Sequence, residues 1–171
     1  MSCRPSAPIL AGLLLSACVG VPQEIRNAPP GDLQPEVVRQ QPDAHLGDRV
    51  RWGGQIVAVE NEENETWVVM VARPLGFAGR PKDTDQSPGR FLARFEGFLD
   101  PATYKAEREL TVSGRLEAPQ TRSVGNYAYL YPVLRVEQSR LWEPQPEYPP
   151  GYRSYPYYDP WYHPWHHPYR W

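Results

Sequence analysis

The chain has 171 residues, enough for one ordinary domain with an appendage. It contains 21 prolines and 13 glycines, which argues against a helix bundle or a coiled coil because both residues weaken helices. A net charge of −2 argues against a sequence-independent nucleic-acid binder, because such proteins carry a basic surface.

Residues 1–17 have the pattern of a secretory signal peptide that is removed during export. A positive charge precedes an apolar core at residues 7–15, which is too short to stay in a bilayer as a spanning helix. The core ends in Leu-Ser-Ala-Cys, the form of a bacterial lipobox, with its cysteine at Cys18. This motif predicts cleavage between Ala17 and Cys18, followed by attachment of diacylglycerol and an N-acyl chain to Cys18. The alternative is an ordinary signal peptide with an incidental cysteine.

Cysteine usage supports a lipid on Cys18. The chain holds two cysteines, and Cys3 lies in the segment expected to be removed, so the mature chain has no partner for an internal disulfide. Two or three acyl chains hold a protein on a bilayer far more firmly than one does. Val19, rather than aspartate, follows Cys18 and favours the outer membrane. We therefore expect a lipid-anchored outer-membrane protein facing the periplasm, with no cofactor besides the covalent lipid.

Residues 18–44 are expected to form an extended and mostly unpacked tether. Five prolines are spread between residues 22 and 42, and apolar residues show little periodicity there. Within this segment, residues 35–39 can form a short helical turn or an edge strand.

Residues 45–142 have the pattern of a small β domain. Runs of alternating or β-branched residues predict strands at 49–59, 66–72, 90–96, 109–117 and 127–136. In the third of these, Leu92 interrupts the alternation. Asp100 followed by Pro101 predicts a short helix that ends near residue 107.

Two features inside the predicted strands indicate how the sheet bends. The pair Gly53-Gly54 predicts a bulge or a sharp coil in the first strand, and Pro132 predicts a bulge or an edge position in the last. Five bent strands with one short helix match a mainly β fold, a five-stranded OB-like Greek-key barrel. An antiparallel sandwich is the alternative.

Several short motifs of the chain form a recognisable set. They lie at 21–25, 47–56, 73–75, 89–93, 97–104, 110–114, 129–132 and 141–142, and the most specific piece is Gly-Phe-Leu-Asp-Pro at 97–101. Together they resemble the starvation-inducible outer-membrane lipoprotein (Slp) family, and the resemblance covers about residues 15–142. The resemblance implies an outer-membrane lipoprotein of Gram-negative bacteria, linked by name to starvation or stationary phase, with no established catalytic activity.

Exposed cations and one aromatic residue define a candidate ligand face on the barrel. Such barrels bind ligands through aromatic and cationic side chains on the middle strands. The residues expected on this face are Arg51, Trp52, Arg90, Arg94, Arg115 and Arg135. An anionic envelope glycan or a lipid headgroup is the expected ligand, and nucleic acid is not expected as a partner. The alternative is an outward row of arginines that serves solubility.

Residues 143–171 form a tail rich in proline, tyrosine and tryptophan, which disfavours helices and central strands. The tail can lie on the barrel, sit at the membrane interface or hold a glycan or envelope protein; a low-complexity tail with weak contacts is the simplest interpretation. His163, His166 and His167 make a weak candidate metal site without a clear carboxylate or cysteine partner.

No catalytic motif is recognisable in the chain. The sequence therefore predicts a non-enzymatic structural or interaction protein, with an envelope protein or glycan as partner. A barrel that binds a glycan or headgroup is the alternative function.

Overall fold

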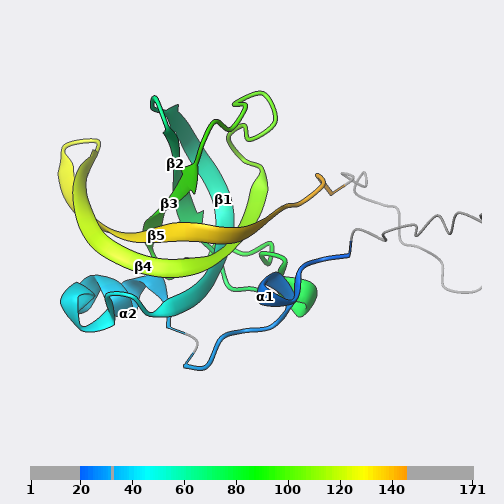
Figure 1. The fold of residues 1–171 in the computed structure, drawn as a ribbon, viewed down its shortest axis with the longest axis horizontal. Helices are drawn as coiled ribbons and strands as arrows, with labels where there is room; N and C mark the ends of the chain where they lie inside the picture. Colours follow the sequence, from blue (N-terminus) through cyan, green and yellow to red (C-terminus); the bar gives the residue numbers. More distant parts are fainter. Residues whose placement is uncertain (1–19, 32, 146–171) are drawn as a thin grey trace, which may run out of the picture.

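The computed structural model describes residues 20–31 and 33–145, which form five strands and short helical segments around one barrel (Figure 1). The strands are β1 (Arg49–Asn61), β2 (Glu65–Ala72), β3 (Arg90–Glu96), β4 (Glu109–Val124) and β5 (Tyr127–Leu141). All five lie where the sequence predicted strands, and β4 and β5 continue further than expected. The mainly β fold is therefore confirmed.

The sheet closes on itself in the order β1-β2-β3-β5-β4, with β4 returning to β1. All neighbouring strands run antiparallel except β3 and β5, which pair in parallel over Leu92–Arg94 and Val133–Arg135. Closure leaves no strand at a free edge of the sheet. The architecture is a closed mixed barrel, not an antiparallel sandwich.

The bend predicted at the glycine pair is where β1 changes partners. Gly54 lies opposite both Ala72 of β2 and Leu110 of β4. A Cβ atom on Gly54 would lie 1.9 Å from the carbonyl oxygen of Val71, so only glycine permits this close approach. The break in register itself comes slightly later, between Ile56 and Ala58.

The barrel interior is filled by the inward-facing side chains of all five strands. Trp52 and Phe91 meet edge to face there, with ring centroids 5.1 Å apart. The alternation predicted for β3 and β4 is confirmed, because Phe91, Ala93 and Phe95 point inward, as do Leu110, Val112 and Leu116. This alternation buries one complete face of each strand.

A second apolar cluster lies on the outer face of the barrel and explains why Leu92 interrupts the pattern of β3. The cluster contains Trp67, Val69, Leu92, Tyr131 and Val133, all nearly inaccessible to water. The long β4–β5 hairpin curls along this face (Figure 1), and Val124 and Tyr129 pack on the cluster. The hairpin register shifts between Glu117 and Gln120, opposite Pro132, which confirms the bulge predicted at that proline.

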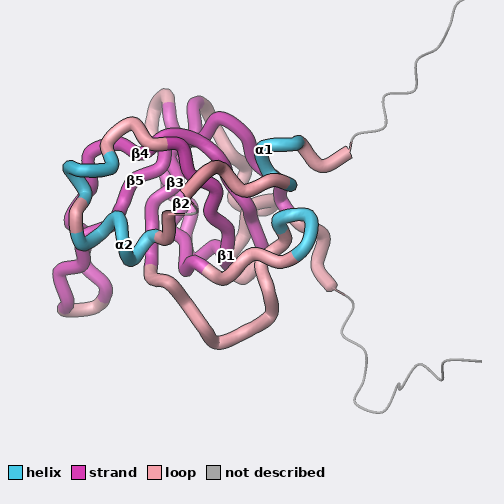
Figure 2. The backbone as a smooth tube through the Cα atoms, turned by 90° about the horizontal axis from the view of Figure 1, so that it is seen from below, coloured by secondary structure: helices cyan, strands magenta, loops and turns pink. Residues whose placement is uncertain are grey.

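The expectation of an extended and unpacked segment before the barrel is wrong for the residues that the structure describes. This segment forms α1 (Gln23–Arg26), α2 (Pro35–Gln40) and the 3-10 helix η1 (Pro42–His45), and α2 confirms the helical turn that was one of the two possibilities at residues 35–39. Ile25 is fully buried, and Val38 is 3 % exposed and belongs to the barrel core. Figure 2 shows α1 and α2 lying against the strands. Ile25, Pro35 and Val38 are all buried, so the segment docks on the barrel although its apolar residues show no period.

The helix expected at residues 100–107 is only a turn. The Asp100 side chain accepts a hydrogen bond from the Ala102 amide, as predicted for a cap, and the Tyr104 amide returns to the Asp100 carbonyl. The Glu107 amide donates to the Ile56 carbonyl of β1. Because this amide is hydrogen-bonded to the sheet, a second helical turn does not form. The remaining 3-10 helix is η2 (Phe77–Gly79). No helix within residues 20–31 and 33–145 is long and apolar enough to cross a bilayer.

Candidate functional site

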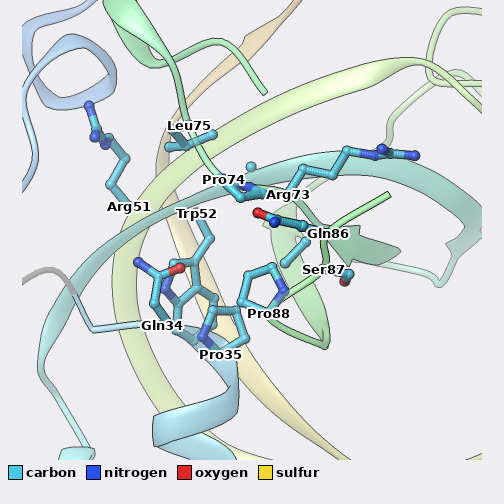
Figure 3. A pocket seen from close by; sticks show the side chains of 12 residues that line it. Gln34, Pro35, Arg51, Trp52, Arg73, Pro74, Leu75, Gln86, Ser87 and Pro88 are labelled. Carbon is cyan, nitrogen blue, oxygen red and sulfur yellow. The ribbon is translucent and has the colours of Figure 1, made fainter. Parts of the chain in front are cut away.

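A cleft of about 440 Å³ opens where the segment before α2, the middle of β1 and the loop after β2 meet (Figure 3). Gln34 and Pro35 line it from the segment before α2, and Gln86, Ser87 and Pro88 line it from the loop before β3. This volume lies within the range of small-ligand pockets. The cleft exists because residues 33–38 fold back onto the barrel.

Trp52 lines the cleft but is almost entirely buried, with 2 % of its surface exposed. Its indole N–H donates to the Leu33 carbonyl at 2.6 Å, and its ring packs on Phe91. The hydrogen bond satisfies the polar atom of a core side chain. The prediction that Trp52 presents its ring on an open ligand face is therefore wrong; Trp52 joins the N-terminal segment to the core.

Arg51 and Arg73 stand at the rim of the cleft, and their guanidinium groups point away from Trp52 (Figure 3). Arg51 donates from Nη1 to the carbonyls of Ile25 at 3.0 Å and Arg26 at 2.7 Å. These are carbonyls in the last turn of α1, which lack helical partners. Arg73 donates from Nη2 to Oε1 of Gln55 at 2.9 Å. The polar groups beside the cleft interior are thus mainly the amides of Gln34 and Gln86.

Four arginines form a continuous row around the outside of the barrel. Arg94 of β3 lies opposite Arg135 of β5, Arg135 lies opposite Arg115 of β4, and Arg115 lies opposite Arg49 of β1. We call these four residues the arginine row. The structure therefore brings together three residues of the predicted ligand face, Arg94, Arg115 and Arg135. Arg51 lies two residues beyond Arg49 on the same strand but binds α1, and Trp52 is buried in the core.

Glutamates interleave with the arginine row and neutralise most of its charge. Glu117 accepts from Arg94 and lies 3.5 Å from Nε of Arg135, while Glu137 pairs with both Arg49 and Arg115. Arg94 also reaches Glu65 at 2.9 Å. An anionic ligand would have to displace these carboxylates. This supports the alternative in which the arginines form an outward row that serves solubility.

Arg94 is the member of the arginine row that contacts two glutamates. Its Nε and Nη2 atoms bind both carboxylate oxygens of Glu117, at 2.8 and 2.6 Å, and Nη1 binds Glu65. The hydrogen bond to Glu117, followed by the bond to Glu65, raises the pKa of Arg94 above its ordinary value. The Arg94 side chain is therefore a permanently charged bridge between β2, β3 and β4.

Arg90 lies at the start of β3 and takes no part in the charged pairs of the arginine row. Its backbone amide donates to the Tyr129 hydroxyl at 3.1 Å, which connects β3 to the curled hairpin. Within residues 20–31 and 33–145, its guanidinium has no ion-pair partner. Arg90 thus remains a candidate cation, two residues beyond Pro88 of the cleft lining.

The predicted cleavage and lipid site at Ala17 and Cys18 lies outside the described residues, as do His163, His166 and His167. Among the residues that are described, no three histidine, cysteine or acidic side chains gather in a way that could hold a metal ion.

Sequence reasoning missed Arg49 of the arginine row and the cleft walls at Gln34, Pro35 and Gln86. Arg49 occupies the same alternating face of β1 as Arg51, so the pattern indicated an outward position. Its place in the row depends on the pairing of β1 with β4, which sequence periodicity does not specify. The cleft walls come from two loops that carry no periodic signal.

The sequence profile described as the Outer membrane lipoprotein Slp family matches residues 15–170 of the chain. An Uncharacterized lipoprotein YeaY of Escherichia coli (strain K12) is 34 % identical over 163 residues, covering 87 % of this chain and 84 % of the relative. The Outer membrane protein Slp of the same strain is 29 % identical over 145 residues, covering 83 % and 77 %. The profile match extends beyond residue 142 and includes nearly all of the tail.

Proposed function

Because this chain belongs to the outer membrane lipoprotein Slp family, we propose that it is a non-catalytic interaction protein, anchored by lipid on Cys18 and facing the periplasm. Its partner on the membrane side is the outer-membrane bilayer, and its second partner is an envelope protein or glycan. It acts in the cell envelope during starvation or stationary-phase stress.

The close docking of α1 on the barrel carries this proposal. Cys18 precedes Gln23 by five residues, which span at most about 18 Å even when fully extended. Ile25 of α1 is fully buried, so the chain joins the barrel directly after the proposed lipid site. A lipid on Cys18 would therefore hold the folded barrel next to the bilayer rather than at the end of a long tether. This arrangement suits a protein that meets its partners at the membrane surface.

The polar chemistry of the described residues also supports an interaction role. The cleft-rim arginines bind a glutamine and backbone carbonyls, and the arginine row binds glutamates. These contacts fasten strands and segments to one another. The surface that results is rigid and close to neutral, which suits recognition by shape and hydrogen bonding.

The intact mass of the protein extracted from membranes tests the proposal. The expected mass is that of a chain beginning at Cys18 with three acyl chains, and a Cys18→Ala variant should leave the membrane fraction. Protease added to whole cells should spare the protein, whereas protease added after the outer membrane is permeabilised should cut it. A mature chain that carries a bare thiol and is released from the cell would refute the anchor.

A second candidate function is a binding module for an anionic envelope glycan or lipid headgroup, and the cleft of about 440 Å³ is the observation that favours it. Gln86 lines the cleft and is exposed, so Gln86→Trp should fill the cleft without disturbing the core. Ser123→Trp, at an exposed position near the tip of the β4–β5 hairpin, is the matched control.

Titration calorimetry with soluble peptidoglycan fragments and with glycerol phosphate tests this second function. Binding to the parent and to Ser123→Trp, together with loss of binding in Gln86→Trp, would establish it. The probe that binds would show whether a glycan or a headgroup is recognised. Equal titrations for all three proteins would remove the cleft from consideration.

A further inference from the structure

We infer that the turn at residues 75–82, here called the Phe77 turn, lies in the headgroup layer of the bilayer and fixes the orientation of the barrel on the membrane. This inference rests on the proposed lipid anchor at Cys18. It adds a second, non-covalent membrane contact and assigns it to one side chain, Phe77.

The Phe77 turn lies beside the part of the chain that leads to Cys18. Figures 1 and 2 show the turn packed against α1, and the two segments approach so closely that a Cβ atom on Gly79 would lie 2.0 Å from the Ile25 carbonyl oxygen. A lipid on Cys18 lies at most about 18 Å of extended chain from the start of α1. The side of the barrel that carries α1 and the Phe77 turn is therefore the side held closest to the bilayer.

The Phe77 side chain is almost completely exposed to solvent. Its exposed fraction is 98 %, higher than the other large exposed hydrophobic residues of the described chain, such as Phe98 at 71 % and Tyr127 at 66 %. A phenyl ring held in water is unfavourable, whereas aromatic side chains are favourable in the boundary between headgroups and acyl chains. A membrane surface at this position would accept the ring.

Backbone contacts hold the turn that carries Phe77 in place. Leu75 and Pro81 form a β-bridge, and the Gly76 amide donates to the Arg80 carbonyl at 2.7 Å. The Gly79 carbonyl accepts a hydrogen bond from the buried Thr111 hydroxyl at 2.7 Å, which fixes the turn to β4. Ala78 has a φ of 60°, a conformation unfavourable for alanine, and these contacts maintain it. The fold thus supports a strained turn whose outermost side chain is an aromatic ring.

An exposed aromatic residue on the other side of the barrel supplies the control. Tyr127 lies at the tip of the β4–β5 hairpin, on the opposite side of the barrel from α1 in both views. If the α1 side rests on the membrane, Tyr127 faces the aqueous periplasm. The orientation therefore predicts opposite environments for two aromatic side chains that are both exposed in the protein alone.

The test uses the full-length, membrane-extracted protein in phosphatidylethanolamine–phosphatidylglycerol vesicles. Because the lipidated mature chain has no other thiol, a cysteine introduced at position 77 or 127 can be labelled selectively with an environment-sensitive fluorophore. The label at Phe77→Cys should shift its emission to shorter wavelength and lose intensity with nitroxide-bearing lipids. The label at Tyr127→Cys should keep the emission that it has in water and should not be quenched.

A label at Lys82→Cys examines the same turn while Phe77 is retained. Its quenching by nitroxide-bearing lipids should fall when Phe77→Ser is added, because the serine has no affinity for the bilayer interface. The Phe77 side chain is exposed, so Phe77→Ser should leave the melting temperature of the protein unchanged.

The intact mass separates failure of the anchor from failure of this inference. If the mass shows no lipid on Cys18, the anchor and the membrane contact of Phe77 are both refuted. If the protein is lipidated but the labels at positions 77 and 127 report the same aqueous environment, the anchor stands and the Phe77 contact is refuted. Quenching at Lys82 that is the same with and without Phe77 would likewise remove Phe77 from this role.

Discussion

Among single residues, Gly54 controls the path of β1. It lies where the strand pairs with β2 on one side and with β4 on the other, and the Val71 carbonyl occupies the space that a side chain would need. The carbonyl belongs to the backbone of a buried strand and cannot rotate away as a side chain could. Closure of the barrel at this point therefore depends on the absence of one methyl group.

We expect Gly54→Ala to reduce the free energy of unfolding by at least about 2 kcal/mol, because overpacking against backbone forces the strands apart. Urea unfolding followed by tryptophan fluorescence measures this loss. Gly20→Ala is the control, since a Cβ atom there meets nothing within 4 Å. Equal stability of the two variants would show that the strands accommodate the methyl group.

Arg94 shows how a charged side chain can stabilise the outside of the barrel. It is 26 % exposed and joins Glu65 on the neighbouring strand β2 to Glu117 on β4, which lies beyond β5. Without Arg94, two carboxylates would face each other across the gap. The single and longer contact of Arg135 to Glu117, at 3.5 Å, offers a comparison within the same row.

We expect Arg94→Gln to lower the free energy of unfolding by about 1 kcal/mol at low salt, since a half-exposed network is worth more than an isolated surface pair. The loss should shrink in high salt, which screens the exposed charges. Arg135→Gln should change stability less at both salt concentrations. Unfolding curves for the two variants at two ionic strengths provide the measurement, and identical curves would contradict the assignment.

Among the elements, the segment before the barrel, residues 20–31 and 33–45, contributes both to the core and to the cleft. Val38 enters the barrel core, and the Leu33 carbonyl accepts the Trp52 indole hydrogen bond. Ile25 holds α1 on the outside, where Arg51 binds its terminal carbonyls. The segment thus builds one wall of the cleft and also determines how far the barrel can move from Cys18.

We expect Ile25→Ala to lower the free energy of unfolding by about 2 kcal/mol or more, because it removes a fully buried side chain. It should also release α1 locally, so that limited proteolysis cuts the chain near Arg26 sooner than in the parent. Val37→Ala, which removes an apolar side chain that is 47 % exposed, should leave both the stability and the cleavage rate nearly unchanged. Parent-like cleavage of Ile25→Ala would show that α1 is held by other contacts.

The strands were predictable because each buries one face, and burial imposes a period of two on the sequence. In the segment before them, the helical turn at 35–39 was one of two possibilities, and α2 confirms it. The docking of this segment was not predictable, because Ile25 and Val38 are single apolar residues separated by prolines and give no period. The family was identified from short motifs around the strands, and the profile match confirms it. The candidate face was only partly predictable, since β pairing decides which arginines become neighbours and burial withdraws Trp52 from the surface.

At the level of the whole molecule, the barrel is completed at its C-terminal end by Trp142. This residue follows β5, is 9 % exposed, and donates from its indole nitrogen to the Thr111 hydroxyl at 2.9 Å. The same hydroxyl donates to the Gly79 carbonyl, so Trp142 also supports the Phe77 turn. Arg80 lies over the indole ring at 5.6 Å from its centroid.

Two truncated chains measure the contribution of Trp142. A chain that ends at Gln145 retains Trp142, whereas one that ends at Leu141 lacks it. We expect the shorter chain to be less stable by about 3 kcal/mol, the usual loss when a buried tryptophan side chain is removed. Thermal or urea unfolding of the two chains gives the difference directly, and similar midpoints would exclude Trp142 from the core.

The short parallel pairing of β3 with β5 determines where the native barrel opens transiently. Only Leu92, Ala93 and Arg94 face β5, whereas β4 follows β5 from Leu110 to Val124. A transient opening of the barrel should first separate the strands with the shortest pairing, because fewer backbone hydrogen bonds must break together. Backbone amides between β3 and β5 should therefore exchange with deuterium sooner than those in the middle of the β4–β5 pairing. The reverse order would show that the barrel opens between other strands.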